Sequence, residues 1–270
     1  MGVLNVTPDS FSDGGAYQDP AAAIEYGLAM VEQGACIIDV GGESTRPGAQ
    51  RVPHGEQIAR TVPVIEQLRQ RSGVLISIDT TSSLVAAAAL DAGADVVNDV
   101  AAGTEDERIL PLVAQRGCGL VLMHRLVPPE ADTYSDQYDR PPDYGDVVTD
   151  VRIYLEARCR VAVEGGVDRS AIVIDPGLGF GKTVEQNHEL IRRAGELTGT
   201  GYPVLSAASR KSFVGAVTGI TDPGRRAIGS TAVSVIHWLA GVRLFRVHDV
   251  AAHREALAVA AGITTRPVSV

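Results

Sequence analysis

Short apolar runs alternate with longer segments of helical spacing along the chain. Eight apolar runs predict strands at residues 2–6, 36–40, 75–79, 96–100, 119–124, 172–175, 204–208 and 244–248. The segments between them predict helices at residues 20–33, 56–71, 82–92, 105–116, 144–164, 184–197, 227–240 and 250–261. The strand segments are apolar on both faces rather than alternating, which is typical of parallel strands covered by helices.

Glycine stands at the end of several predicted helices, just before the next strand. Gly34, Gly93 and Gly166 occupy such positions, which favour a left-handed residue that ends a helix. Eight regular βα units in 270 residues favour a closed (β/α)8 barrel, a TIM barrel, over an open doubly wound sheet, because such barrels typically have about 250 residues. No domain boundary is visible, so we expect residues 1–270 to form a single barrel domain.

The composition agrees with a globular enzyme. Hydrophobic residues make up 45% and charged residues 21% of the chain, an ordinary globular balance. The formal net charge of −9 argues against nucleic acid or an anionic membrane as the main partner. Cys36, Cys118 and Cys159 follow neither a zinc pattern nor a disulfide framework, and we see no signal peptide and no apolar run of membrane-spanning length. We therefore expect a cytoplasmic protein.

Polar residues gather where the predicted strands end. These strand-end residues include Asn5, Asp39, Asp79, Thr80, Asn98, Asp99, His124, Asp175, Ser209, Arg210, Lys211, Arg246 and His248. In a barrel the carboxyl ends of the strands converge on one face, where catalytic residues lie. A single strand-end Asp or Asn is explained equally well as a helix cap. Eight strands that all end in this way favour a catalytic face.

Long loops rich in hydroxyl side chains follow the first two predicted strands, at residues 5–15 and 41–49. Arg46, in the second loop, could hold a phosphate through two parallel N–H groups. Glycine pairs of this kind are usually surface turns, but both loops would overhang the same face as the polar strand ends. The longest predicted loop, residues 125–144, is interpreted either as a lid or rim element or as a solvated insertion.

A glycine-rich segment, DPGLGFGKT, follows the sixth predicted strand at residues 175–183. It is neither a Walker A nor a dinucleotide-binding motif, because glycines that those motifs require would fall on Pro176 and Lys182. We interpret it as a strand-to-helix loop that lets a planar ligand approach the backbone and the carboxylate of Asp175.

Two further patterns indicate anion binding. Residues 209–212 end the seventh predicted strand and open a short helix, whose N–H groups would attract a carboxylate or phosphate. Arg246 and His248 alternate along the eighth predicted strand, so their side chains should point the same way. The alternative for this pair is a structural pairing with Asp39 or Asp249.

Together these segments resemble the dihydropteroate synthases, over nearly the whole chain. The matching segments are residues 2–15, 41–49, 77–80, 98–99, 122–124, 175–182, 209–213 and 246–249. The resemblance implies that 7,8-dihydropterin-6-ylmethyl diphosphate reacts with 4-aminobenzoate to give 7,8-dihydropteroate and pyrophosphate, with Mg²⁺ as cofactor. It also suggests a homodimer, and the net charge leaves no expectation of a nucleic acid or membrane partner.

The resemblance further implies a role for particular residues. The pterin would be bound by Asp79, Asn98, Met123, Asp175, Phe180 and Lys211. The diphosphate would be bound by Asn5, Thr45, Arg46, Arg246 and His248, with Asn5 next to the metal. The 4-aminobenzoate would be bound by Phe11, Pro47 and Ser212. The catalytic set would be Asp79, Asp175, Lys211, Arg246 and His248. Ala207 stands where the family usually has Gly, and its methyl group would tighten the pterin pocket.

The residue types suit this chemistry. The pterin edge offers donors that carboxylates accept and acceptors that an amide serves. The departing pyrophosphate concentrates negative charge, which calls for a metal, an arginine and a histidine. No protein nucleophile is required.

Three other functions are considered. A methyltetrahydrofolate-dependent methyltransferase would share the pterin pocket, but would not need the Ser-Thr-Arg-Pro loop at residues 44–47 or the Arg246 and His248 pair. A Schiff-base aldolase would use Lys211, and trapping with borohydride would reveal it. A pterin-binding protein without activity is disfavoured by the intact anion-binding residues.

Overall fold

Eight parallel strands form the centre of the molecule, in a computed structural model that describes residues 1–7 and 20–264. The first six are hydrogen-bonded in chain order: β1 (Gly2–Asn5), β2 (Ile37–Gly41), β3 (Leu75–Asp79), β4 (Val96–Asp99), β5 (Gly119–Met123) and β6 (Ile172–Asp175). The remaining two, β7 (Leu205–Ser206) and β8 (Leu244–Phe245), pair with each other.

Two further parallel bridges close these strands into a barrel. Ile174 of β6 pairs with Val204, and Gly2 of β1 pairs with Val247. The Val3 N–H donates to the Val247 carbonyl at 3.0 Å. The predicted (β/α)8 barrel is therefore confirmed. The last two strands, over residues 205–206 and 244–245, are shorter than predicted. Val204 and Val247 form only single bridges, and the His248 N–H donates to the Ser209 hydroxyl rather than to a strand carbonyl.

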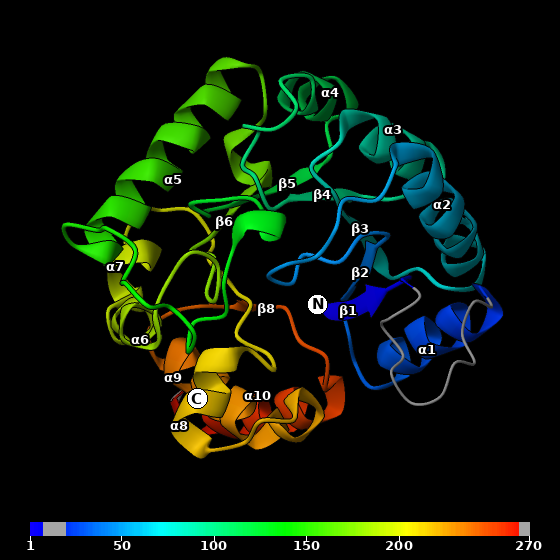
Figure 1. Cartoon of the computed structure of the whole chain (residues 1–270). Coiled ribbons are helices and arrows are strands. Elements are labelled where there is room, and N and C mark those ends of the chain that lie inside the picture. Colours follow the sequence, from blue (N-terminus) through cyan, green and yellow to red (C-terminus); the bar gives the residue numbers. More distant parts are fainter. Residues whose placement is uncertain (8–19, 265–270) are drawn as a thin grey trace, which may run out of the picture.

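Helices form a ring outside the strands (Figure 1). They are α1 (Pro20–Glu32), α2 (His54–Arg71), α3 (Ser83–Asp91), α4 (Ile109–Arg116), α5 (Val147–Glu164), α6 (Val184–Arg192), α7 (Ala194–Thr198), α8 (Ser212–Thr218), α9 (Ala227–Leu239) and α10 (Val250–Thr264), with the 3-10 turns η1 (Pro129–Ala131), η2 (Arg169–Ala171) and η3 (Pro223–Arg225). The main apolar core includes Leu4, Ile38 and Ile76 on the strands and Leu68 and Leu155 on the helices, all fully buried.

Three helices end in the glycine motif that the sequence predicts. Gly34, Gly93 and Gly166 have φ angles of 99°, 109° and 95°. In each case the following N–H donates to a carbonyl five residues earlier, as Ala35 does to Met30 at 2.9 Å. Glycine adopts this left-handed conformation without steric cost, so it returns the chain sharply to the next strand.

Several predicted helix boundaries are wrong. α2 begins at His54, before the predicted residue 56, and α10 ends at Thr264, after the predicted residue 261. The helix predicted from residue 105 begins at Ile109, because the Asp106 carboxylate accepts hydrogen bonds from the Ser83 and Arg108 N–H groups and holds the preceding residues in turns. The helix predicted from residue 144 begins at Val147, where Asp146 caps it. The helix predicted over residues 184–197 is divided at Arg193, whose φ and ψ of −105° and 23° lie outside the helical range.

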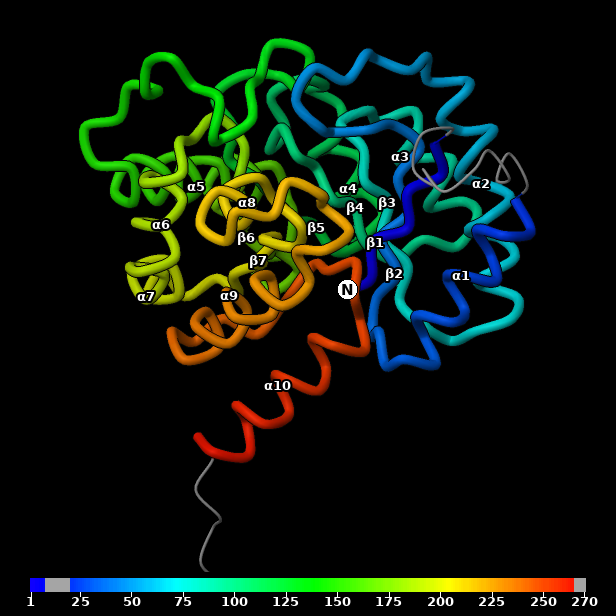
Figure 2. The backbone as a smooth tube through the Cα atoms, turned by 60° about the horizontal axis from the view of Figure 1, so that its bottom comes forward, coloured from blue at the N-terminus to red at the C-terminus, as the bar shows by residue number. Residues whose placement is uncertain are grey.

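The carboxyl ends of the strands and their long loops lie on one side of the barrel (Figure 2). We call this side the mouth. On the opposite side, α10 projects away from the body of the molecule. Within the described residues, no helix combines the length and apolar character that crossing a membrane requires. The fold therefore directs the polar strand ends towards one shared opening.

Candidate active site

A buried ion triad of Asp39, Asp79 and Arg246 joins three strand ends at the mouth. Arg246 donates from Nε to Asp39 Oδ2 at 2.6 Å and from Nη2 to Asp79 Oδ2 at 2.7 Å. The side chains of the two aspartates are 0% and 4% exposed, and that of Arg246 is 15% exposed. The Asn98 amide donates to the same Asp39 oxygen at 3.1 Å. The triad therefore fixes the strand-end amide as well as the two carboxylates.

Two buried carboxylates around one guanidinium leave an excess negative charge. Burial raises the pKa of Asp79 to about 7, while Arg246 opposes the rise and the charge of Asp39 adds to it. Asp79 Oδ1 is buried and accepts no hydrogen bond from any residue in the described part of the chain. Buried acceptors are normally satisfied, so an N–H donor of a ligand would suit this position.

Asp175, at the end of β6, provides a third buried carboxylate. Its Oδ1 accepts a hydrogen bond from the Gly177 N–H at 2.7 Å. Burial raises the pKa of Asp175, and this hydrogen bond and the charge of Lys211 oppose the rise. Burial has the opposite effect on the cationic Lys211 and lowers its pKa to about 8. The Lys211 ammonium group lies 3.9 Å from the centre of the Phe180 ring, a cation–π contact that fixes its position.

Apolar side chains flank the carboxylates. Val100, Met123 and Phe180 form a small cluster apart from the main core, and each is less than a tenth exposed. A cavity of about 20 Å³ beside Val100 is lined by Glu43, Thr45, Arg51, Gln57, Asp79, Thr80, Thr81, Val100, Arg125 and Pro129. The combination of apolar faces and a carboxylate–amide edge suits a flat heterocycle with polar atoms on its rim. We call this region the central slot, with Asp79, Asn98, Asp175 and Lys211 at its edge.

Lys182, which the sequence analysis did not assign to the site, holds the glycine-rich loop in shape. Its side chain is fully buried. Its ammonium group donates to the carbonyls of Gly177 at 3.0 Å and Phe180 at 2.8 Å, and lies 3.0 Å from His124 Nδ1. The available signal was its rarity, because Lys182 and Lys211 are the only lysines in the sequence.

The glycines of this loop lie against other parts of the protein. Gly177 has a φ of 67°, and a Cβ atom there would lie 1.9 Å from the His124 carbonyl oxygen. At Gly179, with a φ of 79°, a Cβ atom would lie 3.0 Å from Cδ of Lys211. The glycines therefore allow the loop to approach the chain after β5 and the Lys211 side chain, a reason that the sequence pattern alone did not indicate.

Residues 125–144, which we call the rim loop, pack over the mouth. Asp132 accepts a hydrogen bond from the Gly181 N–H at 3.1 Å, and the Ser135 N–H donates to the Ser212 hydroxyl at 3.1 Å. Both Asp132 and Ser135 are buried. Of the two interpretations of this loop, the contacts favour a rim element over a solvated insertion.

The residues predicted to bind anions lie at the same end of the barrel. Asn5 ends β1, and its side-chain oxygen lies against Gly41. His248 Nδ1 lies 3.1 Å from the Ser209 hydroxyl, and burial lowers the pKa of His248 to about 3.

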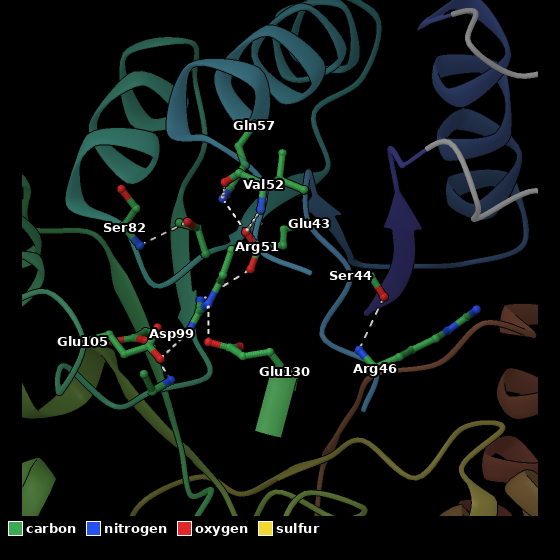
Figure 3. Close-up of polar contacts among 12 residues, drawn as sticks. Glu43, Ser44, Arg46, Arg51, Val52, Gln57, Ser82, Asp99, Glu105 and Glu130 are labelled. Atoms are coloured by element: carbon green, nitrogen blue, oxygen red, sulfur yellow. Dashed lines mark hydrogen bonds and ion pairs between the residues drawn. The ribbon is translucent and has the colours of Figure 1, made fainter. Parts of the chain in front are cut away.

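Thr45 lines the cavity beside Asp79. Arg46 is exposed and points away from the polar group around Arg51 (Figure 3). Arg246 has the structural pairing with Asp39 that was its alternative, together with a pairing to Asp79.

The residues predicted to bind 4-aminobenzoate are only partly placed. Phe11 lies outside the described residues. Pro47 is half-buried in the loop after β2, and Ser212 is the first residue of α8, where a helix start was predicted. Ala207, after β7, is buried, so its extra methyl group points into packed surroundings. For Asp39, the sequence indicated a role only in the alternative interpretation, as a structural partner of Arg246.

Comparison with known families gives the class of protein. A family model described as pterin binding enzyme matches residues 1–248, so the barrel is one of the pterin-binding enzymes. The chain is 48% identical to a dihydropteroate synthase of Mycobacterium leprae, over 96% of this chain and 91% of that protein. The chain thus belongs to the dihydropteroate synthase family.

Solved structures agree with this placement. A Xanthomonas albilineans dihydropteroate synthase with 4-aminobenzoic acid superposes with a TM-score of 0.90 at 41% identity, covering 99% of this chain and 93% of that one. A structure from the same organism in complex with 7,8-dihydropteroate gives a TM-score of 0.87 at 38% identity, covering 99% and 94%.

Replacing Gly177 by Ala should destabilise the protein more than replacing Gly117, although their φ angles of 67° and 60° are similar. An Ala in the left-handed conformation costs about 1–2 kcal/mol, and only this cost is expected at Gly117, where a Cβ atom meets nothing within 4 Å. At Gly177 the clash with the His124 carbonyl should add about 1–3 kcal/mol. Urea unfolding of both variants measures the difference, and equal destabilisation would contradict the loop geometry.

Proposed function

We propose that this chain, as one barrel domain over residues 1–270, condenses 7,8-dihydropterin-6-ylmethyl diphosphate with 4-aminobenzoate to give 7,8-dihydropteroate and pyrophosphate in folate biosynthesis. The observation that carries the proposal is the buried triad beside Asn98 and Asp175, because it presents a carboxylate–amide edge to a flat ring. The 4-aminobenzoic acid and 7,8-dihydropteroate bound by related proteins support it.

The pterin would lie with its polar edge on Asp79, Asn98 and Asp175. Its 2-amino and ring N–H groups would donate to the two carboxylates, including the unpaired Asp79 Oδ1. Met123 and Phe180 would contact the faces of the ring, with the Lys211 stem beside them. These rigid, buried partners would orient the reactive methylene group towards the mouth.

The diphosphate would lie among Asn5, Thr45, Arg46, Arg246 and His248. Arg46 would supply positive charge, whereas Arg246, whose charge is already met by Asp39 and Asp79, would offer a further N–H donor. The lowered pKa of His248 keeps its imidazole neutral near pH 7, so it would contribute a hydrogen bond rather than a charge. These groups would stabilise the negative charge that develops on the departing pyrophosphate.

A Mg²⁺ ion fits this arrangement as a partner of the diphosphate. Among residues 1–7 and 20–264, no group of three or more His, Cys, Asp or Glu side chains could hold a metal ion. Mg²⁺ commonly needs only one or two protein oxygens when substrate phosphates supply others, and Asn5 offers an amide oxygen at the mouth. When bound, the ion would neutralise charge on the leaving group.

The 4-aminobenzoate would bind between Phe11, Pro47 and Ser212, near the start of α8. Its amine is weakly basic, so it needs positioning rather than deprotonation before it attacks. The bond between the methylene carbon and the diphosphate oxygen breaks, with the electron pair leaving on oxygen. The amine nitrogen then bonds to that carbon and releases a proton.

The direct test mixes the protein with the pterin diphosphate, 4-aminobenzoate and Mg²⁺ and measures dihydropteroate and pyrophosphate.

Asp175→Asn should weaken pterin binding by about 10- to 100-fold, the range for losing hydrogen bonds to a charged group, without unfolding the protein. Asp91→Asn is the control, because that carboxylate is 64% exposed at the end of α3. Absence of product from the wild type would refute the function, and unchanged pterin affinity in Asp175→Asn would refute the slot.

The pH dependence of kcat/KM for the pterin diphosphate should be bell-shaped. The pKa of Asp79 is raised to about 7, so activity should fall as the pH drops through this value and the carboxylate is protonated. The pKa of Lys211 is lowered to about 8, so activity should fall as the pH rises through this value and the ammonium is lost. In Lys211→Arg the alkaline limb should disappear, because a guanidinium stays protonated. Persistence of that limb would assign it to another group.

A homodimer through α9 and α10 is part of the proposal. Ile228 and Leu239 of α9 are 85% and 64% exposed, and Val259 and Ile263 of α10 are 63% and 78% exposed. An apolar surface of this kind is typical of an interface. Leu239→Glu should therefore give a monomer in light scattering, whereas Ile153→Glu, at an exposed site on α5, should not. A wild-type monomer would exclude the dimer. We also expect a cytoplasmic location, from the cysteine pattern.

A further inference from the structure

Arg51 lies at the centre of a polar group that joins three loops of the mouth (Figure 3). Its guanidinium donates to Glu105 at 2.5 Å, to Glu130 at 3.2 Å and to Glu43 at 3.4 Å. Glu105 lies between β4 and α4, Glu130 lies in η1 of the rim loop, and Glu43 lies in the same β2–α2 loop as Arg51. One side chain therefore connects the loops that follow β2, β4 and β5.

Glu43 closes the loop after β2 into a ring. One of its carboxylate oxygens faces Arg51, and the other accepts hydrogen bonds from the Val52 N–H at 3.0 Å and the Gln57 amide at 2.7 Å. The segment enclosed in this way, residues 44–51, contains the side chains proposed to meet the diphosphate and the 4-aminobenzoate. Its shape therefore depends on the Glu43 and Arg51 side chains.

The polar group is anchored on a buried side chain near the slot. Glu105 pairs with Arg125 as well as with Arg51, and the Arg125 side chain is only 7% exposed. Arg125 stands two residues after the end of β5 and lines the small cavity that also contains Asp79. The loop after β2 is thus linked to the rigid barrel through Arg51, Glu105 and Arg125 in turn.

Little apolar packing supports this loop on its outer side. A cavity of about 650 Å³ lies there, lined by Glu43, Arg51, Val52, His54, Gln57, Thr81, Ser82, Glu105, Asp106, Glu107 and Arg108. Arg51, Glu43 and Gln57 line both this cavity and the small one beside Asp79, so they separate the slot from the outer cavity. Where a cavity replaces packed side chains, polar contacts decide where the loop lies.

We infer that Arg51 is a positioning residue that fixes residues 44–51 for binding of the diphosphate and 4-aminobenzoate, without contacting either substrate. The Arg51 side chain is 40% exposed, and ion pairs of exposed groups contribute little to overall stability. Its effect should therefore appear in loop order and substrate binding rather than in unfolding. A loop ordered before the substrates arrive has less entropy to lose on binding. This inference rests on the proposed function.

The test compares Arg51→Met with Arg108→Met. Arg108 lines the same outer cavity, but among the described residues its only ion pair is with Asp106, and its side chain is 69% exposed. Hydrogen–deuterium exchange of residues 42–52, without substrates, should be about tenfold faster in Arg51→Met, and unchanged in Arg108→Met. The KM for 4-aminobenzoate should rise about five- to tenfold in Arg51→Met, with a smaller change in kcat. Arg51→Lys, which keeps the charge but not the three-way contact, should lie between.

Binding of a pterin without the diphosphate separates positioning from general damage. The groups at the pterin edge do not contact Arg51, so the dissociation constant of 7,8-dihydropterin should change less than about twofold in Arg51→Met. Equal loss of dihydropterin and 4-aminobenzoate binding would overturn the inference. So would unchanged exchange of residues 42–52. If the wild type makes no dihydropteroate, the proposed function fails, whereas the exchange measurement still decides whether Arg51 holds the loop.

Discussion

The positive charge of Arg246, buried between Asp39 and Asp79, is the interaction on which the mouth of the barrel depends. A charge is expensive to remove from water, and it is stable here only because two carboxylates meet it at 2.6 and 2.7 Å. Losing one partner of such a pair costs about 3–5 kcal/mol. The carboxylates come from β2 and β3 and the arginine follows β8, so the triad forms only when the barrel closes. Closure thus builds the slot. It leaves Asp79 Oδ1 without a hydrogen-bond partner among the described residues, so this oxygen is available to a ligand.

Polar side chains also hold the loops around this centre, where apolar packing is thin. Lys182, fully buried, binds two carbonyls of the glycine-rich loop and keeps Phe180 beside Lys211. Arg51 connects the loop after β2 with two others. The two arrangements differ in energy. A buried ammonium without its acceptors would be strongly destabilised, whereas a half-exposed guanidinium contributes mainly to local order. The central slot should therefore be rigid, and the loops proposed to meet the second substrate more adaptable.

Much of the fold could be predicted from the sequence, because local patterns determine it. The apolar runs gave eight strands, and Gly34, Gly93 and Gly166 marked helix ends that the structure confirms. The strand-end residues Asp79, Asn98 and Asp175 do lie together, since parallel strands must end on one face.

Most contacts between distant segments could not be predicted. The pairing of Arg246 with Asp39, 207 residues away, was foreseen only as an alternative, and the pairing of Arg51 with Glu130, 79 residues away, was not foreseen. The start of α4 depends on a similar contact, between Asp106 and Ser83. Such pairings depend on how the loops lie once the barrel has closed, which no local pattern specifies.

A crystal structure of the chain with bound 7,8-dihydropterin would decide whether the triad and its neighbours form a pterin slot. We expect the ring to lie against Met123 and Phe180, with its N–H groups donating to Asp79 Oδ1 and Asp175 and with the Arg246 contacts to Asp39 and Asp79 retained. A ring bound elsewhere, such as in the outer cavity beside Arg51, or a ring that displaces Arg246 from both aspartates, would show that this slot does not bind the pterin.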